Sequence, residues 1–489
     1  MWDVFLAAWP VMVSVLHVAG AVAVTLHAVL GRREVPAIIG WVGLAWLAPV
    51  IGSFAYVAFG INRIKRKAVR LGHPAPVLRP TSITEELAAR VLDEADERSV
   101  ASLLSRPGMR GLTRLGESVT GNPLLPGNRI TALVDGDQAF PEMLAAINSA
   151  VDSVWLLSYI FDADRVGLQF LEALRAAHAR GVQVRVLIDD VGARYSRPSM
   201  PSRIADAGIP VRTFLPTRGP RVLRYANLRN HRKILVVDGT VGFTGGMNIR
   251  EGHQLSLRPE SPVRCLHFKC EGPIVDDMAQ VFATDWAFSC GETLTIPARK
   301  SSPDKHGSVI ARGVPDGPDS DIDNLPEMLI GALASARERV RIVTPYFLPD
   351  GRLLSALRVA AMRGITVDIV LPAQNNITIM NWAVVPQFTE LLEVGCAVWL
   401  SPPPFDHTKL FVVDGHWSLI GSTNWDARSL RLNFEYNIEC FDHGLAATLE
   451  SLAESRIVSA HRVDMAALHA RPFWQHLRDG LARLLSPYL

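Results

Sequence analysis

The 489-residue sequence has few cysteines and almost no net charge, and parts of it contain no charged residue at all. Its five cysteines form no CxxC pair, which excludes a disulfide framework and a clustered-cysteine zinc site and fits a reducing compartment. Fifty basic against 48 acidic residues leave a net charge of +2, so no global polycation argues for nucleic acid as a partner. A hydrophobic content of 48% and a mean hydropathy of +0.17 exclude a disordered chain.

Two uncharged runs near the N-terminus hold much of this apolar character. Residues 4–30 and 36–60 contain no Lys, Arg, Asp or Glu, and each run reaches the roughly 20 residues that cross a bilayer. They predict a two-helix transmembrane hairpin over residues 1–65. A cleaved signal peptide is the alternative for the first run, but that run lacks a basic leading segment and a second run follows it at once.

Basic residues are more numerous after the second run than in the loop between the two runs. Five follow it, against two arginines in the loop: Arg63, Lys65, Arg66, Lys67 and Arg70 against Arg32 and Arg33. Positive residues stay on the cytoplasmic side of a membrane. The pattern therefore predicts a multi-pass protein of the cell membrane with a cytoplasmic catalytic body.

The rest of the chain is organised as a connector and two similar halves. Residues 66–128 are polar and rich in proline, with a predicted helix over residues 83–104. Residues 129–300 contain predicted strands at 154–157 and 184–188, with a helix between them that ends at Gly181. Residues 301–489 repeat this order with strands at 340–343 and 367–371 and a helix ending at Gly364. Strand, helix and strand form a βαβ unit, so the fold class is α/β.

A shorter pattern that recurs in both halves establishes the duplication. His231, Lys233 and Asp238 precede a Gly-rich segment with Asn248, and His407, Lys409 and Asp414 precede another with Asn424. In both copies seventeen positions separate the histidine from the asparagine. Chance agreement of this length is negligible.

This residue set suits phosphoryl transfer on a diester. Alternation along a strand puts His and Lys of each copy on one face, and the Gly-rich turn lets Asn return to it. Two lysines and two asparagines hold the non-bridging oxygens and neutralise the charge that grows in the transition state. One imidazole attacks phosphorus while the other protonates the departing alcohol, so no metal and no cofactor are required. The two imidazoles must then converge on a single phosphorus atom.

The duplicated HxKxxxxD pattern resembles the phospholipase D superfamily. Its context, NHRKILVVDG…GFTGGMNI and DHTKLFVVDG…GSTNWDARSLRLNFE, together with the N-terminal hairpin, resembles bacterial cardiolipin synthases over nearly the whole chain. The resemblance implies two pseudo-symmetric α/β/α sandwich halves. It also implies that a phosphatidyl group passes from one phosphatidylglycerol to another through a phosphohistidine, with release of glycerol.

The resemblance also assigns roles to individual residues. It implies His231 as the nucleophile and His407 as the acid and base, with Lys233, Lys409, Asn248 and Asn424 around the phosphate. Asp238 and Asp414 complete the motifs, and we expect them to bond nearby backbone or basic side chains. Ser422 is expected to add a hydrogen bond to phosphate, which Gly246 at the matching place cannot.

A departure from the family pattern concerns the carboxylates that orient the histidines. Glu435 follows the second motif at the place where the family sets a carboxylate against a motif histidine. In the first half, Cys265 stands where family members carry Asp. We expect this to leave the orientation of His231 unsupported, with Glu251 as a substitute.

An arginine-rich segment before the first motif and an apolar segment near the C-terminus have two possible roles each. An arginine-rich stretch enters the first motif and reads either as a solvated basic face or as a guide for anionic headgroups. Apolar residues near the C-terminus recur at helical spacing and are expected to pack on the body, with membrane contact as the alternative. His253 and His267 are assigned no role. The residues of the two segments are Arg218, Arg221, Arg224, Arg229 and Arg232, and Trp474, Leu477, Leu481, Leu484, Leu485 and Tyr488.

Alternative functions remain open at this stage. The phosphohistidine is also compatible with hydrolysis by a phospholipase D, and with phosphatidylethanolamine or ethanolamine as substrate. A nuclease of the same superfamily is disfavoured by the apolar N-terminus and the near-zero net charge. A catalytically inactive lipid-binding protein is suggested by Cys265. The sequence does not give the oligomeric state.

Overall fold

The computed structural model describes most of the chain as two compact units: N-terminal helices and a larger body that holds every described strand. The predicted helix over residues 83–104 lies almost entirely outside the described residues. These are residues 2–31, 35–57, 101–102, 105–106, 108–216, 228–296, 307–318 and 323–486.

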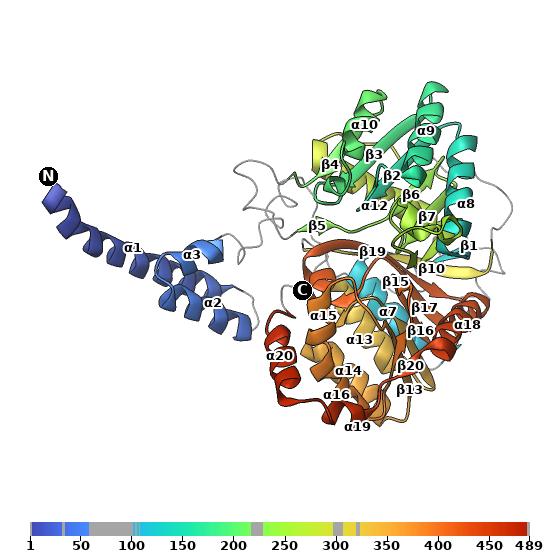
Figure 1. Ribbon diagram of the computed structural model, residues 1–489. Helices are drawn as coiled ribbons and strands as arrows, with labels where there is room; N and C mark the ends of the chain where they lie inside the picture. Colours follow the sequence, from blue (N-terminus) through green and yellow to red (C-terminus); the bar gives the residue numbers. More distant parts are fainter. Residues whose placement is uncertain are drawn as a thin grey trace. The chain divides into compact units, whose positions relative to one another are not determined.

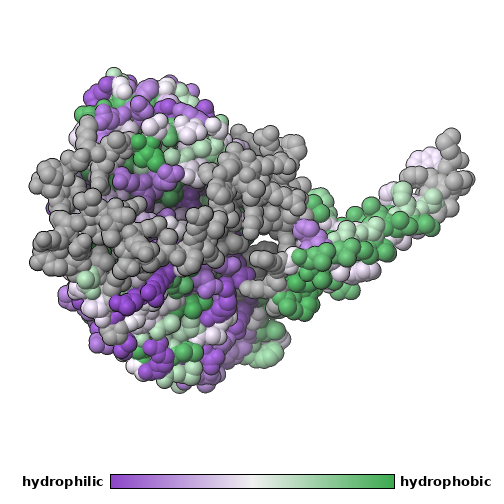
Figure 2. All heavy atoms as spheres, turned by 180° about the vertical axis from the view of Figure 1, so that it is seen from behind, coloured by the Kyte–Doolittle hydropathy of each residue, from purple (hydrophilic) through white to green (hydrophobic). Residues whose placement is uncertain are grey.

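The N-terminal unit contains one long apolar helix followed by two short ones. Helix α1 (Trp2–Leu30) includes a 23-residue stretch, Ala8–Leu30, with a mean hydropathy of 2.0. Helix α2 (Val35–Leu47) packs against α1, and α3 (Ile51–Ala55) follows a break at Val50, whose φ is 60°. Figure 2 shows this unit as a largely hydrophobic surface, in contrast to the mixed surface of the body.

The second predicted span is therefore not one continuous helix. Thirteen residues of α2 rise only about 20 Å, which is less than the roughly 30 Å of a bilayer's hydrocarbon core. Among the described residues, α1 alone is long and apolar enough to cross a membrane. Of the expected hairpin, the described residues show one helix of spanning length followed by an interrupted apolar segment, and a second span stays a prediction.

The body is built on a sheet of sixteen strands in which two similar series meet (Figure 1). From the outer edge, the second half contributes β20 (His461–Arg462), β14 (Ala397–Ser401), β13 (Thr366–Pro372), β11 (Arg339–Val343), β16 (Leu410–Val413), β17 (Trp417–Gly421), β19 (Asn433–Phe441) and β10 (Val309–Asp316). The first half continues with β1 (Leu125–Val134), β9 (Leu266–Glu271), β7 (Val241–Gly245), β6 (Ile234–Val237), β2 (Ser153–Ser158), β3 (Gln183–Asp189) and β4 (Val211–Phe214). The sixteenth strand, β5 (Arg229–Asn230), pairs with β19 outside this order. Apart from β20, the two series run in matching order away from the β10–β1 junction, which is the signature of a pseudo-twofold axis.

Each half is a sandwich of helices around its part of the sheet, as the sequence predicts. In the first half, α8 (Asp135–Ser149) and α9 (Arg165–Ala179) cover one face and α12 (Ile274–Cys290) covers the other. Alternate residues of β2 show this: Leu156 belongs to the core under α8 and α9, while the Trp155 ring stacks on Phe282 of α12. In the second half, α13 (Asn324–Ser335), α14 (Gly351–Met362) and α16 (Val385–Leu392) face α18 (His443–Ser459) across the sheet.

The two βαβ units are confirmed, and they begin and end in the same way. Asp164 and Asp350 cap α9 and α14 by accepting hydrogen bonds from backbone N–H groups of the first turn. Gly181 and Gly364, with φ of 88° and 87°, follow the C-caps and adopt the left-handed conformation that glycine tolerates. Strands β2 and β3, like β11 and β13, pair in parallel.

The region between the N-terminal unit and the first half contributes to the body. Helix α7 (Met109–Thr120) packs on α13, and its Met109 and Leu112 belong to the core of the second half. The described end of the predicted connector therefore serves as a structural element of the second half.

Candidate active site

Short strands exchanged between the halves position the two motifs. Strand β5 (Arg229–Asn230), just before the first motif, pairs with β19 of the second half, and the His231 N–H donates to the Phe434 carbonyl at 2.8 Å. Strand β15 (Phe405–Asp406), before the second motif, pairs with β8 (Val263–Arg264) of the first half. There the His407 N–H donates to the Arg264 carbonyl at 2.7 Å. The backbone of each motif histidine is therefore hydrogen-bonded to the other half, His231 to Phe434 and His407 to Arg264.

This exchange brings the two imidazoles together. The ring centroids of His231 and His407 are 6.4 Å apart with planes at 80°, and both side chains are buried. The rings come from positions 176 residues apart in sequence. The convergence that the duplicated motif predicts is present in the structure.

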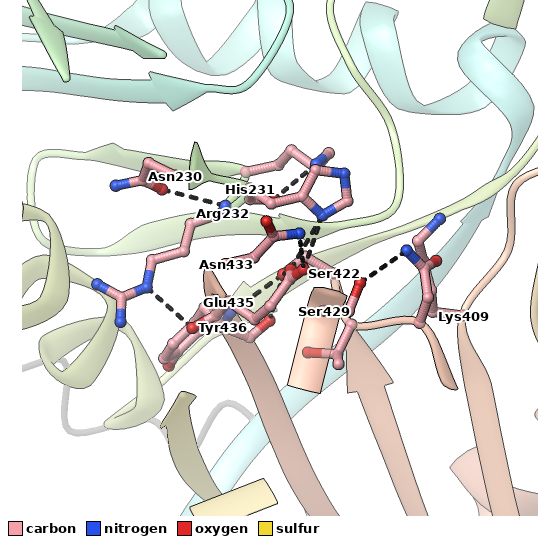
Figure 3. Close-up of polar contacts among 12 residues, drawn as sticks. Asn230, His231, Arg232, Lys409, Ser422, Ser429, Asn433, Glu435 and Tyr436 are labelled. Carbon is pink, nitrogen blue, oxygen red and sulfur yellow. Dashed lines mark hydrogen bonds and ion pairs between the residues drawn. The ribbon is translucent and has the colours of Figure 1, made fainter. Parts of the chain in front are cut away.

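The two imidazoles are oriented by different groups. The Nδ1 atom of His231 lies 3.0 Å from both carboxylate oxygens of Glu435, as Figure 3 shows. The Nδ1 atom of His407 lies 2.9 Å from the backbone oxygen of Gly246. Both acceptors require Nδ1 to carry the proton, which leaves Nε2 of each ring unprotonated and available to a substrate.

The pairing of carboxylates with histidines that we expected from sequence is wrong. Cys265 does match Glu435 by position. Gly245 pairs with His267 across β7 and β9, and Gly421 pairs with Asn437 in the same way across β17 and β19. Cys265 and Glu435 each lie two residues before the second partner of these pairs. However, strand exchange places Cys265 beside His407, where its Sγ lies 3.3 Å from the backbone oxygen of that residue. His231 is oriented by Glu435 rather than by Glu251, and among the described residues it is His407 that has no carboxylate on its Nδ1.

The two lysines take equivalent positions. The Nζ atoms of Lys233 and Lys409 donate to the backbone oxygens of His231 and His407, each at 2.6 Å. Burial lowers the pKa of Lys233 to about 7 and that of Lys409 to about 8, and the charge of Lys409 also lowers the pKa of Lys233. Two ammonium groups close together in a buried site make it a receptor for an anion.

The histidines share this electrostatic environment. Burial lowers the pKa of His231 to about 4 although Glu435 opposes the change, and burial together with the lysines lowers the pKa of His407 well below its usual value. Burial tends to raise the pKa of Glu435, but its pairing with His231 and the charge of Lys233 prevail and lower it. The unliganded site thus holds neutral imidazoles and an ionised carboxylate near neutral pH.

The asparagines of the motifs line the same cavity. Asn248 accepts a hydrogen bond from the Ile160 N–H at 3.2 Å, and Asn424 donates to the Ser429 hydroxyl at 3.0 Å. The amide oxygen of Asn424 is buried and has no hydrogen-bond partner among the described residues. Both asparagines therefore border the same cavity as the two histidines.

The expectation that Ser422 bonds a phosphate is wrong. Its buried hydroxyl donates to Glu435 at 2.5 Å (Figure 3) and accepts from the Tyr436 N–H at 3.0 Å. Ser422 is not among the residues that line the cavity. Asn433 donates to the other carboxylate oxygen of Glu435 at 3.1 Å. Ser422 and Asn433 therefore position the carboxylate that orients His231.

The motif aspartates lie in turns at the far end of the motif strands. Asp238 accepts hydrogen bonds from the N–H groups of residues 151–153, and Asp414 accepts from those of residues 337–339, at 2.7 to 3.0 Å. Both have a positive φ, of 51° and 52°. Each aspartate anchors the start of β2 or β11 to its motif strand, and neither contacts a motif histidine.

A cavity of about 780 Å³ contains the two histidines and the two asparagines. Around His407 it is largely aromatic: the rings of Tyr346 and Phe405 lie 6.2 and 6.0 Å from it, and His253 lies 6.3 Å away. Around His231 the cavity is more polar, with Tyr159 at 5.1 Å and two arginines in the wall, Arg229 and Arg428.

Several of these wall residues carry no role in the sequence-based interpretation. Tyr159 directly follows β2 and Tyr346 follows β11 after two residues, so a tyrosine close to the end of the same strand in both halves is the signal that would have identified them. His253 donates from Nδ1 to the Val263 backbone oxygen and receives a hydrogen bond from Asn248 on Nε2. Nothing in a single copy of the motif distinguishes His253 from an ordinary surface histidine.

The arginine-rich stretch divides into residues with different environments. Arg218, Arg221 and Arg224 lie outside the described residues. Arg229 lines the cavity, whereas Arg232 is buried and donates to Asp285 at 2.7 Å and to the Glu435 backbone oxygen at 2.9 Å. Arg232 is therefore a structural ion-pair residue and does not belong to a solvated basic face.

Comparison with known families and proteins gives a consistent result. The family described as "Cardiolipin synthase, PLD-like domain" matches residues 143–286 and 329–457, one segment in each half. The major cardiolipin synthase ClsA of Bacillus subtilis is 30% identical over 463 residues, covering 94% of this chain and 95% of that protein. Cardiolipin synthase A of Serratia proteamaculans is 31% identical over 478 residues, covering 95% and 96%.

Among solved structures, the chain is similar in fold to the phosphatidylserine synthase of Haemophilus influenzae Rd KW20. The TM-score is 0.60 at 15% sequence identity, and the match covers 81% of this chain and all of that chain. This likeness supports the two-half α/β architecture.

Proposed function

The chain belongs to the family of cardiolipin synthases with a phospholipase D-like domain, and we propose that it is a phosphatidyltransferase that makes cardiolipin from two phosphatidylglycerols. The observation that carries this proposal is the pair of imidazoles from the two motifs, 6.4 Å apart in one cavity with two lysines beside them. We place α1, and α2 with α3, in the cell membrane and the catalytic body on its cytoplasmic side.

His231 is the nucleophile in the proposed first step. Its Nε2 attacks the phosphorus of a phosphatidylglycerol, the bond to the glycerol oxygen breaks, and the leaving oxygen takes a proton from His407. The carboxylate of Glu435 stabilises the positive charge that the ring gains on forming the phosphohistidine. His407 acquires its proton when the anionic diester enters, because a negative charge nearby raises the pKa of an imidazole.

The second step reverses the roles around the same phosphorus. A hydroxyl of the second phosphatidylglycerol gives its proton to His407 and attacks, and the bond to His231 breaks, which yields cardiolipin and regenerates the enzyme. Lys233 and Lys409, with Asn248 and Asn424, hold the non-bridging oxygens in both steps. The aromatic wall beside His407 disfavours water and thereby favours a lipid alcohol as acceptor.

The alternatives differ in the acceptor or in the substrate. A hydrolytic phospholipase D passes the phosphatidyl group to water, and a variant enzyme uses phosphatidylethanolamine as donor or ethanolamine as acceptor. The interpretation as an inactive lipid-binding protein is no longer supported by Cys265. Glu435 orients His231, and Cys265 lies beside His407 instead.

Lipid mass spectrometry of the purified full chain tests the proposal. Incubated in liposomes with phosphatidylglycerol and no added metal, the protein should form cardiolipin and glycerol in equal amounts. Phosphatidic acid as the sole product would instead identify a hydrolase, and added ethanolamine or phosphatidylethanolamine would reveal the headgroup variants. The His231→Ala protein, prepared in parallel, controls for a contaminating activity.

A further inference from the structure

Helix α20 (Phe473–Arg483) packs on the body in the opposite sense to an ordinary amphipathic helix. Asp479 is 1% exposed, with Arg471 at 2.8 Å and Arg478 at 2.8 Å from its carboxylate. By contrast, the apolar residues face outward: Trp474 is 74% exposed and Leu484 is 72% exposed, and Phe473, Leu477, Leu481 and Leu485 are also exposed. The sequence-based expectation that this stripe packs on the body is therefore wrong for its described residues, and Tyr488 lies outside them.

The exposed residues form one continuous stripe. Positions 474, 477, 481, 484 and 485 recur three, four, three and one apart, which places them on one side of the helix and its last turn. Exposed apolar patches of this kind mark an interaction surface, because leaving them in water is unfavourable. We call this stripe the α20 face, made of Phe473, Trp474, Leu477, Leu481, Leu484 and Leu485.

The α20 face lies close to the lip of the catalytic cavity. Helix α20 packs against α15 (Thr378–Ala383), and the Arg478 guanidinium lies 4.7 Å from the centre of the Trp382 ring. Met380 of α15 and the preceding Ile377 line the cavity, and Ile377 is itself exposed. These residues stand on the side of Tyr346, whose hydroxyl donates to Asn376. Helix α20 therefore packs on the helix that carries part of the cavity wall on the side of Tyr346.

The composition of the helix indicates what covers this face. Residues 471–483 contain three arginines and one aspartate, so the segment carries net positive charge beside its leucines and its aromatic pair. Leucines with tryptophan on one side and basic residues around them are typical of helices that lie in the headgroup region of anionic membranes.

We propose that the α20 face docks on the surface of a bilayer that contains phosphatidylglycerol, and that it holds the lip of the cavity against the membrane so that lipid enters past Ile377. The role of this contact in lipid entry rests on the proposed function. Docking of the α20 face on a bilayer does not depend on that function, and it can be measured without any catalytic turnover.

Site-specific fluorescence quenching tests the docking. In the full chain carrying Cys290→Ser, which removes the exposed cysteine, Leu481→Cys is labelled with an environment-sensitive dye and reconstituted in phosphatidylglycerol liposomes. Val458→Cys on α18, where the native valine is 79% exposed, is the matched control. A nitroxide on the lipid chain should quench the label at 481 at least threefold more than the label at 458, and aqueous iodide should do the reverse.

Two results would overturn the proposal. Equal access of iodide to both labels means that the face stays in water. Protection of the label at 481 from both quenchers means that protein covers it, either the N-terminal helices of the same chain or a second copy.

Activity measurements separate this proposal from the proposed function. The Leu477→Ser and Leu481→Ser double variant should make cardiolipin from long-chain vesicles at least fivefold more slowly than the native chain, while Val458→Ser should not. Both variants should match the native chain on monomeric short-chain phosphatidylglycerol. Equal loss on both substrates would contradict docking, whereas a native chain inactive on both would contradict the proposed function and leave the quenching result standing.

Discussion

The two halves of the body share the groups that we propose to be catalytic but not the groups that support them. Histidine, lysine, asparagine and aspartate occupy matching positions in both motifs. In contrast, the support of His231 is Glu435, held by Ser422 and Asn433, whereas the support of His407 is a backbone carbonyl with Cys265 nearby. The groups that we propose to act together on one phosphorus are alike in the two halves, whereas the groups that orient each histidine differ.

The difference fits a division of labour between the two histidines. A ring that becomes covalently phosphorylated gains positive charge and benefits from a carboxylate on Nδ1 throughout the life of the intermediate. A ring that accepts and returns a proton must not hold it too strongly, and a neutral carbonyl acceptor on Nδ1 serves this purpose. The asymmetry therefore supports His231 as nucleophile and His407 as acid and base.

The largest expected effect comes from removing either histidine. His231→Ala and His407→Ala should each lower cardiolipin formation by about 10³-fold or more, because a step is lost in each case. The roles of the two histidines are distinguished with a phosphatidyl ester of p-nitrophenol, because nitrophenolate leaves without taking up a proton. His407→Ala should still release one burst of nitrophenol per enzyme, and His231→Ala should release none. The opposite pattern would assign the nucleophile to His407.

The second prediction compares the supports directly. Glu435→Gln should lower kcat by about 10²- to 10⁴-fold, because the amide no longer stabilises the charged ring; the loss of the aspartate in a serine-protease triad has a comparable effect. Cys265→Ala, at the matching position, should lower kcat less than threefold, because the Gly246 carbonyl still orients His407. Steady-state kinetics in liposomes measures both. Similar losses in the two variants would mean that the supports are equivalent after all.

The duplication, the two βαβ units and the catalytic set were predictable from sequence, because each depends on local periodicity or on residues that recur at equal spacing. The pairing of supports was not. Glu435 faces His231 because β5 and β15 cross between the halves, and strands of two residues leave no pattern in the sequence. The break at Val50 and the outward leucines of α20 were missed for a related reason: an apolar run records hydrophobicity but not the direction it faces or where its helix ends.

The third prediction uses the two lysines, which are alike in sequence but differ in pKa. Below pH 7 both are protonated and attract the diester. As pH rises through about 7 for Lys233 and about 8 for Lys409, the free site loses positive charge. Because both lysines must be protonated to hold the diester, we expect kcat/KM to fall by roughly tenfold per pH unit between pH 7 and 8 and by up to roughly a hundredfold per pH unit above pH 8. Lys409→Arg, whose guanidinium does not titrate in this range, should fall less steeply, and a profile flat to pH 9 would contradict the electrostatic account.

The smallest expected effect belongs to Ser422, where the first half already carries glycine. Ser422→Ala removes one hydrogen bond to Glu435, a loss of about 0.5–1.5 kcal/mol, so activity should fall about two- to tenfold. Because Ser422 acts through Glu435, the loss should vanish in a Glu435→Gln background, which a double-mutant cycle measures. A full additional loss in that background would place the hydroxyl on the substrate instead, and the difference between the halves would then extend to phosphate binding itself.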